Sequence, residues 1–175
     1  MTPGQVYREG AYKGLIMGGY LTLLSICTLT SHLSSFASIM TLALLISTPV
    51  ITFRLMAASF RKYQCVANFS SLWMLGISIF IGGSLICAVT TFAYLQIFDP
   101  TYFYDRSTET LAALEKIPEL ADSDLTRSLR IVVDGGLLPS IIEYCIQMML
   151  ATIFCGSILS ILIAPFVRML RRKQK

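Results

Sequence analysis

Residues 72–98 read LWMLGISIFIGGSLICAVTTFAYLQIF, a stretch without charge that is long enough to cross a bilayer. The hydrocarbon core is about 30 Å thick, and about 20 apolar helical residues span it. Three further stretches of this kind lie at about 14–33, 36–53 and 141–167. Lipid offers no hydrogen-bond partner to backbone groups, and these stretches lack the alternation of barrel strands, so each should be a helix. The sequence therefore predicts an all-α fold, an integral membrane four-helix bundle.

The composition supports a membrane protein independently of the spans. Apolar residues make up 55% of the chain and charged residues only 14%, with a mean hydropathy of +0.69. Soluble domains carry about 25% charged residues. A length of 175 residues favours a single membrane domain over 1–175. The basic excess beside membrane spans indicates topology, so we expect no nucleic-acid partner.

Charges are sorted between the connections, and this predicts the orientation. Basic residues cluster before the first span, after the second and after the fourth: Arg8, Lys13, Arg54, Arg61, Lys62, Arg168, Arg171, Arg172, Lys173 and Lys175. The other two connections hold most of the acidic residues: Asp99, Asp105, Glu109, Glu115, Glu119, Asp122, Asp124 and Asp134. The positive-inside rule then places both termini in the cytoplasm. The first span is too long for a signal peptide and is expected to be retained.

The residues needed for catalysis are missing from the sequence pattern. Cys27, Cys87, Cys145 and Cys155 fall within spans, and no two cysteines have the C-x-x-C spacing of a redox or zinc site. No nucleophile with a base and no set of metal ligands can be recognised. We therefore expect no catalytic residues, no metal, no cofactor and no enzymatic activity.

Small residues recur at helical spacing in several spans. Gly10, Gly14 and Gly18 lie four residues apart and share one helix face, which allows another backbone to approach closely. Further small-residue positions are Gly82, Gly83, Gly156 and Ser160. Such faces either bind a partner or pack against another helix of the same chain, and the second interpretation is favoured.

The second span should continue as a helix beyond the lipid core, over about 54–64. Arg54 and Arg61 are seven residues apart and lie near one face. Together with Lys62, Arg171 and Arg172, they could bind lipid phosphates or an acidic partner. The alternative, which is the more common case, is that such cations only fix the helix end at the interface.

The connection over about 99–140 is predicted to form a long outer loop with short amphipathic helices. Ser107 can cap one helix that carries Leu111 and Leu114, and Ser123 can cap a second one. The apolar side of the second helix would hold Leu125, Leu129, Val132 and Val133, with Gly135 and Gly136 ending it. These helices should lie on the bilayer surface or over the bundle.

Glu143 is the one carboxylate inside the apolar stretches. An acidic residue within a membrane span is a candidate functional site. However, Arg168 lies 25 residues further on, about 37 Å along a helix, so Glu143 should be close to the outer interface. Pairing with Arg127 or Arg130, or contact with water, is the favoured interpretation.

Three short segments carry a resemblance to a known family: Tyr7 to Gly19, Phe60 to Tyr63, and Asp99 to Phe103. Over essentially its whole length the chain resembles the family of bacterial inner-membrane proteins known as domain of unknown function 4199. The resemblance implies a four-span architecture in the bacterial inner membrane and implies no reaction. It also implies a partner, a polyprenyl-phosphate glycosyltransferase that lacks its own membrane anchor.

Two functional classes follow from these observations. The first is a non-catalytic membrane subunit or scaffold that binds lipid and a partner protein, which could be another copy of itself. The alternative is a small transporter of a small molecule or lipid, which would need ionisable residues near the midplane or broken helices in inverted repeats. Because the sequence offers only Glu143 for that role, the first class is favoured.

Overall fold

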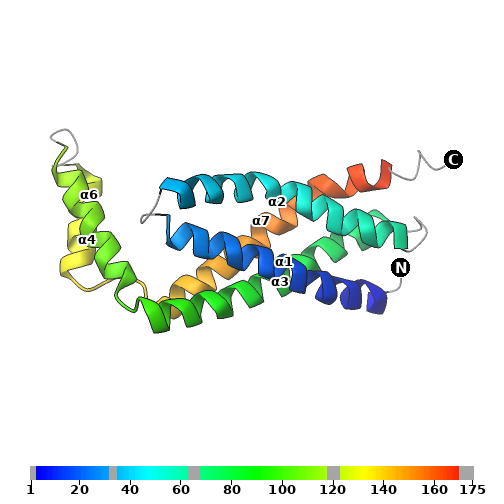
Figure 1. Ribbon diagram of the computed structural model, residues 1–175, viewed down its shortest axis with the longest axis horizontal. Coiled ribbons are helices and arrows are strands. Elements are labelled where there is room, and N and C mark those ends of the chain that lie inside the picture. Colours follow the sequence, from blue (N-terminus) through cyan, green and yellow to red (C-terminus); the bar gives the residue numbers. More distant parts are fainter. Residues whose placement is uncertain (1–2, 32–34, 63–67, 118–122, 170–175) are drawn as a thin grey trace. The chain divides into compact units, whose positions relative to one another are not determined.

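The structure is a computed structural model that describes residues 3–31, 35–62, 68–117 and 123–169. His32, Cys65, Arg171 and Arg172 lie outside the described residues. Within those ranges the fold is all-α, as predicted, and no strand is present. The helices are α1 (Pro3–Leu29), α2 (Ser35–Lys62), α3 (Phe69–Phe98), α4 (Tyr102–Glu115), α6 (Asp124–Asp134) and α7 (Ile141–Met169) (Figure 1).

Four of these helices, α1, α2, α3 and α7, are long and apolar enough to cross a membrane. The helix α1 begins at Pro3, well before the predicted start of the first span at Gly14, and ends at Leu29; the predicted end at Leu33 lies outside the described residues. The apolar pattern fails before Gly14 since Glu9 and Lys13 interrupt it, yet both residues are buried and the helix continues through them. The expected extension of the second span is confirmed as far as Lys62.

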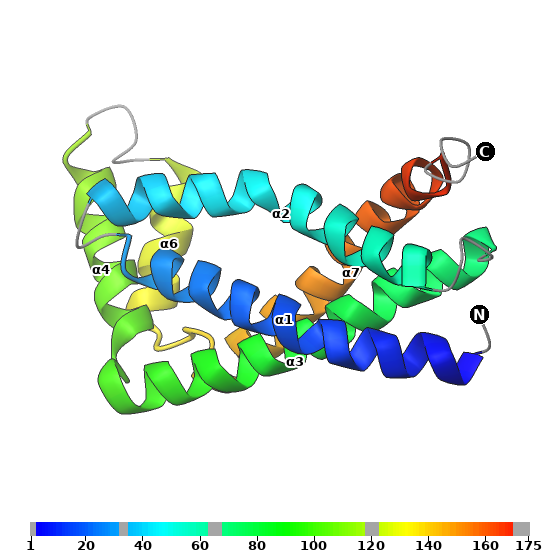
Figure 2. The same cartoon turned by 45° about the vertical axis from the view of Figure 1, so that its right-hand side comes forward.

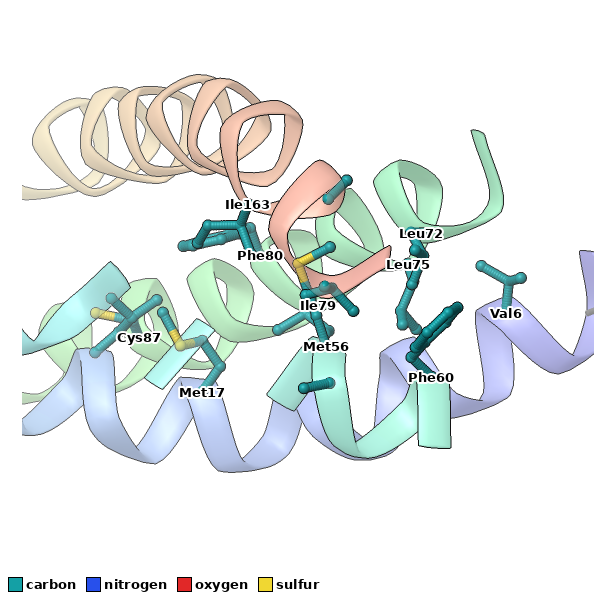
Figure 3. Close-up of a cluster of buried hydrophobic side chains, with 14 residues drawn as sticks. Val6, Met17, Met56, Phe60, Leu72, Leu75, Ile79, Phe80, Cys87 and Ile163 are labelled. Carbon is teal, nitrogen blue, oxygen red and sulfur yellow. The ribbon is translucent and has the colours of Figure 1, made fainter. Parts of the chain in front are cut away.

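The chain divides into two compact units. The first comprises Met1–Thr91 together with Ile146–Lys175, and the second comprises Phe92–Cys145. In the first unit α1 runs beside both α2 and α3 (Figures 1 and 2), and α7 contacts α3 where Gly156 and Ser160 meet Phe80 and Gly76. All four long helices contribute to its apolar core (Figure 3), whose fully buried members include Val6, Met17, Met56, Phe60, Leu72, Leu75, Ile79 and Val167.

Among its described residues, the second unit contains two short helices, α4 and α6. Ser123 caps α6 as predicted, because its hydroxyl accepts the N–H of Thr126 at 3.3 Å. Gly135 ends α6, and Gly136 adopts a φ of 63°, which glycine tolerates best. The predicted cap at Ser107 was wrong. The helix α4 already begins at Tyr102, where the chain leaves the turn that follows Pro100.

Side chains link the two short helices to each other. Arg130 of α6 forms an ion pair with Glu115 of α4, and Arg106 pairs with Glu109 at 2.6 Å within α4. On α6, Val133 is buried and Leu129 and Val132 are half-buried, as predicted, whereas Leu125 is exposed and Thr126 is buried in its place. Phe103 contacts Tyr144 with ring centroids 4.9 Å apart. Burial raises the pKa of the neighbouring Tyr102 phenol above its usual range.

Candidate functional site: a buried charge cluster and an apolar groove

The glycine face of α1 packs against α3. A Cβ atom placed on Gly14 would lie 3.2 Å from the Cα of Gly82, and one placed on Gly10 would lie 2.4 Å from the Cβ of Ser78. On the α3 side, a Cβ on Gly83 would lie 3.3 Å from the backbone nitrogen of Gly18. These glycines therefore bring two backbones of the same chain together, which is the close approach that small residues permit in membrane helices.

A second close contact joins α3 to α7. A Cβ on Gly156 would lie 2.2 Å from the Phe80 ring, and a Cβ on Gly76 would lie 2.3 Å from the Ser160 hydroxyl oxygen. Ser160 is fully buried and donates its hydroxyl to the carbonyl of Gly156 at 2.7 Å. The small residues singled out in the sequence are thus occupied in helix contacts within the chain.

A buried charge cluster lies between the first turns of α1 and the last turns of α2. Glu9 is only 6% exposed and Lys13 only 8%. Lys13 donates from its ammonium to the backbone carbonyl of Leu55 at 2.6 Å, and Glu9 forms an ion pair with Lys62. Glu9, Lys13, Lys62 and the Leu55 carbonyl are called the charge cluster below.

The carbonyl that accepts Lys13 belongs to Leu55, which stands four residues before a buried serine, Ser59. Most hydroxyls in these helices donate to the carbonyl four residues earlier, as Thr52 does to Thr48 at 2.9 Å. Ser59 stands four residues after Leu55 and is fully buried, yet among the described residues no partner lies within hydrogen-bond distance of its hydroxyl. The hydrogen bond from Lys13 to the Leu55 carbonyl therefore couples α1 to α2.

The charge cluster was missed by the sequence interpretation, which treated Lys13 only as a topology marker. A signal was present, because Glu9 and Lys13 are four residues apart with the acid first, the spacing that places opposite charges side by side on a helix. Buried charges within spanning helices are costly and mark functional or structural sites. Unlike Glu143, they are therefore the ionisable residues of interest in this chain.

One face of α2 is left uncovered. Only 6% of its apolar stretch is buried within the chain, against 44% for α3 and 39% for α1. The exposed residues Phe36, Ile39, Ala43, Ile46, Val50, Arg54 and Arg61 recur at intervals of three, four and seven. They form one stripe, called the α2 face below, which is apolar for four turns and ends on two arginines. Lys62, by contrast, is engaged by Glu9.

Hydroxyl groups join α1 and α2 near the middle of both helices. Tyr20 donates its hydroxyl to the carbonyl of Leu44, which also accepts Ser47 at 3.0 Å and Thr48 at 3.2 Å. The α2 ribbon bends in this middle part (Figure 2), and α2 contains Pro49, which lacks an N–H donor. The hydroxyls hold the two helices together at a point where regular helix bonding is interrupted.

An apolar groove of about 280 Å³ lies in the first unit, between the four long helices. Leu45 and Thr48 of α2 form one wall, and α7 forms the opposite wall from Met148 to Leu159. Leu21, Leu24 and Phe80 complete it from α1 and α3. Of the residues that the structure describes, none that lines the groove is charged.

Glu143 is not buried in the membrane span but exposed in the first turn of α7. Its carboxylate accepts the backbone N–H of Ser140 at 2.9 Å, and Ser140 accepts the N–H of Glu143 at 3.3 Å. This is a capping box, for which the S-x-x-E spacing was visible in the sequence. Of the favoured alternatives, the exposed position agrees with contact with water, whereas Arg130 forms its ion pair with Glu115.

The described part of the chain holds no group of three or more histidine, cysteine or acidic residues that could bind a metal ion. Its four long apolar helices define a multi-pass membrane protein. The family model described as "Protein of unknown function (DUF4199)" matches residues 12–169, and the chain belongs to this family. Comparison with curated proteins and with solved structures gives no match.

Proposed function

We propose that this protein is a non-catalytic subunit of the bacterial inner membrane that binds a second membrane protein through the α2 face. The observation that carries the proposal is the small covered share of α2, 6%, in a chain whose other long helices bury 28–44% of their apolar stretches. A partner that fits the α2 face has an apolar helix that packs against Ile39, Ile46 and Val50. Beyond this apolar part, it carries carboxylates that can pair with Arg54 and Arg61.

Charge complementarity decides the chemistry of the partner. Arg54 and Arg61 are exposed and lie on the same side of α2 as the apolar stripe. A guanidinium group recognises a carboxylate with two parallel hydrogen bonds, which fixes the register between two helices. A polyprenyl-phosphate glycosyltransferase, the partner that the family resemblance implies, is the first protein to test.

The partner experiment uses the double variant Arg54→Gln/Arg61→Gln. The tagged chain is purified in mild detergent, and a stoichiometric membrane protein should co-elute with the unaltered chain. The double variant should bind it at least about tenfold more weakly, since tenfold corresponds to about 1.4 kcal/mol. Arg168→Gln is the matched control, because it removes one exposed basic residue from the end of α7 and should leave binding unchanged.

Replacing the partner's acidic residues by glutamine should weaken binding of the unaltered chain by a similar factor and have little further effect on the double variant. Co-elution of phospholipid alone would contradict the proposal. Equal recovery of the partner with the unaltered chain and with Arg54→Gln/Arg61→Gln would contradict it as well.

The proposal includes an orientation with both termini in the cytoplasm. In a cysteine-free background, a cysteine at Lys116, between α4 and α6, should react with a membrane-impermeant maleimide on spheroplasts. A cysteine at Asn68, just before α3, should react only after the membrane is opened. Both residues are exposed in the fold, so access depends on the membrane. The reverse labelling pattern would show that the termini face outward.

A further inference from the structure

We propose that the apolar groove holds a single acyl chain of a membrane phospholipid, which enters from the side between α2 and α7. The groove lies on a different side of α2 from the α2 face, because Leu45 and Thr48 are not members of that stripe. The proposal therefore does not depend on the protein partner.

The hydrogen-bonding state of the lining argues for an apolar occupant. Two hydroxyls border the groove, and both are already used within their own helices. Thr48 donates to the carbonyl of Leu44 at 3.2 Å and Thr152 to the carbonyl of Met148 at 2.8 Å. The remaining lining is aliphatic or aromatic apart from the thiol of Cys155 and Gly156. A polar ligand would lose its own hydrogen bonds on entering, whereas a hydrocarbon has none to lose.

The dimensions distinguish a lipid chain from a protein helix. The α7 wall from Met148 to Leu159 rises about 16 Å, at 1.5 Å per residue. A helix about 10 Å in diameter would occupy on the order of 1,200 Å³ over that length, several times the groove volume of about 280 Å³, so it does not fit. One hydrocarbon chain, whose carbon atoms approach the lining to about 3.5–4.0 Å, is narrow enough.

The volume of the groove also matches part of one acyl chain. An apolar cavity of about 150 Å³ accommodates benzene, with its six carbons, so the groove holds on the order of ten carbons. Ala151 and Gly156 keep the α7 wall shallow enough for this. Gly156 itself has no free space, because the Phe80 ring already fills the position of its Cβ. Ala151 is therefore the residue at which added volume would compete with the bound chain.

The hydrophobic effect cannot hold the acyl chain in the groove, because the surrounding lipid is equally apolar. Close packing against the lining residues must hold it instead. The test therefore measures position in a bilayer instead of affinity from water. The purified protein is reconstituted in vesicles of phosphatidylethanolamine and phosphatidylglycerol containing a phosphatidylglycerol with a photoactivatable diazirine near one chain end. After irradiation, lipid adducts are mapped by peptide mass spectrometry.

Adducts per residue on the groove-lining residues of α7 (Met148, Ala151, Thr152, Cys155 and Leu159) should exceed those on the α2 face at least about fivefold. Ala151→Phe should reduce the groove adducts by a similar factor. Ala43→Phe is the matched control, because it adds the same ring to an exposed alanine outside the groove, and it should change nothing there. Arg54→Gln/Arg61→Gln should also leave the groove adducts intact, so failure of the partner proposal is distinguishable.

Two results would overturn the inference. Equal adduct yields on the groove residues and on the α2 face would mean that only ordinary surrounding lipid contacts this chain. Groove adducts that persist in Ala151→Phe, with the variant as thermally stable as the unaltered protein, would place the photoreactive chain outside the groove.

Discussion

Gly14→Leu is expected to prevent recovery of folded protein, or to lower its free energy of unfolding by about 3 kcal/mol or more. Already a Cβ at this position would lie 3.2 Å from the Cα of Gly82 and 3.4 Å from the carbonyl oxygen of Ile79. Both neighbours are backbone atoms, so no side chain can rotate away. The three further carbons of leucine must push α1 and α3 apart along their whole contact.

Gly19→Leu is the matched control for this substitution. It makes the same chemical change in the same helix, but nothing lies within 4 Å of a Cβ at Gly19, which is exposed. Because glycine is a poor helix former, this variant should unfold at an unchanged or slightly higher temperature. Thermal unfolding in detergent compares the two. Similar melting of both variants would show that α1 and α3 are not in backbone contact at Gly14.

This contrast also shows what the sequence could and could not establish about the fold. The four-residue spacing of Gly10, Gly14 and Gly18 is enough to place them on one helix face. It could not identify the opposing helix, because Gly82 and Gly83 on α3 and Gly156 on α7 offer the same small-residue pattern. Which of these helices packs against α1 depends on how all four long helices pack together, and a local sequence pattern does not contain that information.

The candidate site was predicted less well than the fold, for a related reason. Glu143 was singled out because it is the one carboxylate inside the apolar stretches, yet it lies exposed in the first turn of α7 and closes a capping box with Ser140. Glu9 received no role in the sequence interpretation, yet it is buried and forms an ion pair with Lys62 of α2. Burial of an ionisable group depends on the neighbouring helix, here on the Leu55 carbonyl and Lys62, which are more than 40 residues away along the chain.

Glu9→Gln should destabilise the protein by about 2 kcal/mol, because it leaves the buried ammonium of Lys13 without a nearby negative charge. Removing one partner of a fully buried ion pair costs about 3–5 kcal/mol. The lower value is expected here because Lys62, the residue in direct contact with Glu9, is largely exposed. Unfolding free energies at pH 7 in one detergent provide the measurement, and Lys62→Met, which removes the exposed cation, should cost less than Glu9→Gln.

A double-mutant cycle isolates the coupling between Glu9 and Lys13. Lys13→Met keeps an apolar side chain of similar length and removes the buried ammonium together with its hydrogen bond to the Leu55 carbonyl. In Glu9→Gln/Lys13→Met no unpaired charge remains buried, so most of the stability lost in Glu9→Gln should return, with a coupling energy above about 1 kcal/mol. If the two single effects simply add, Glu9 does not stabilise Lys13, and the cluster reduces to the ion pair between Glu9 and Lys62.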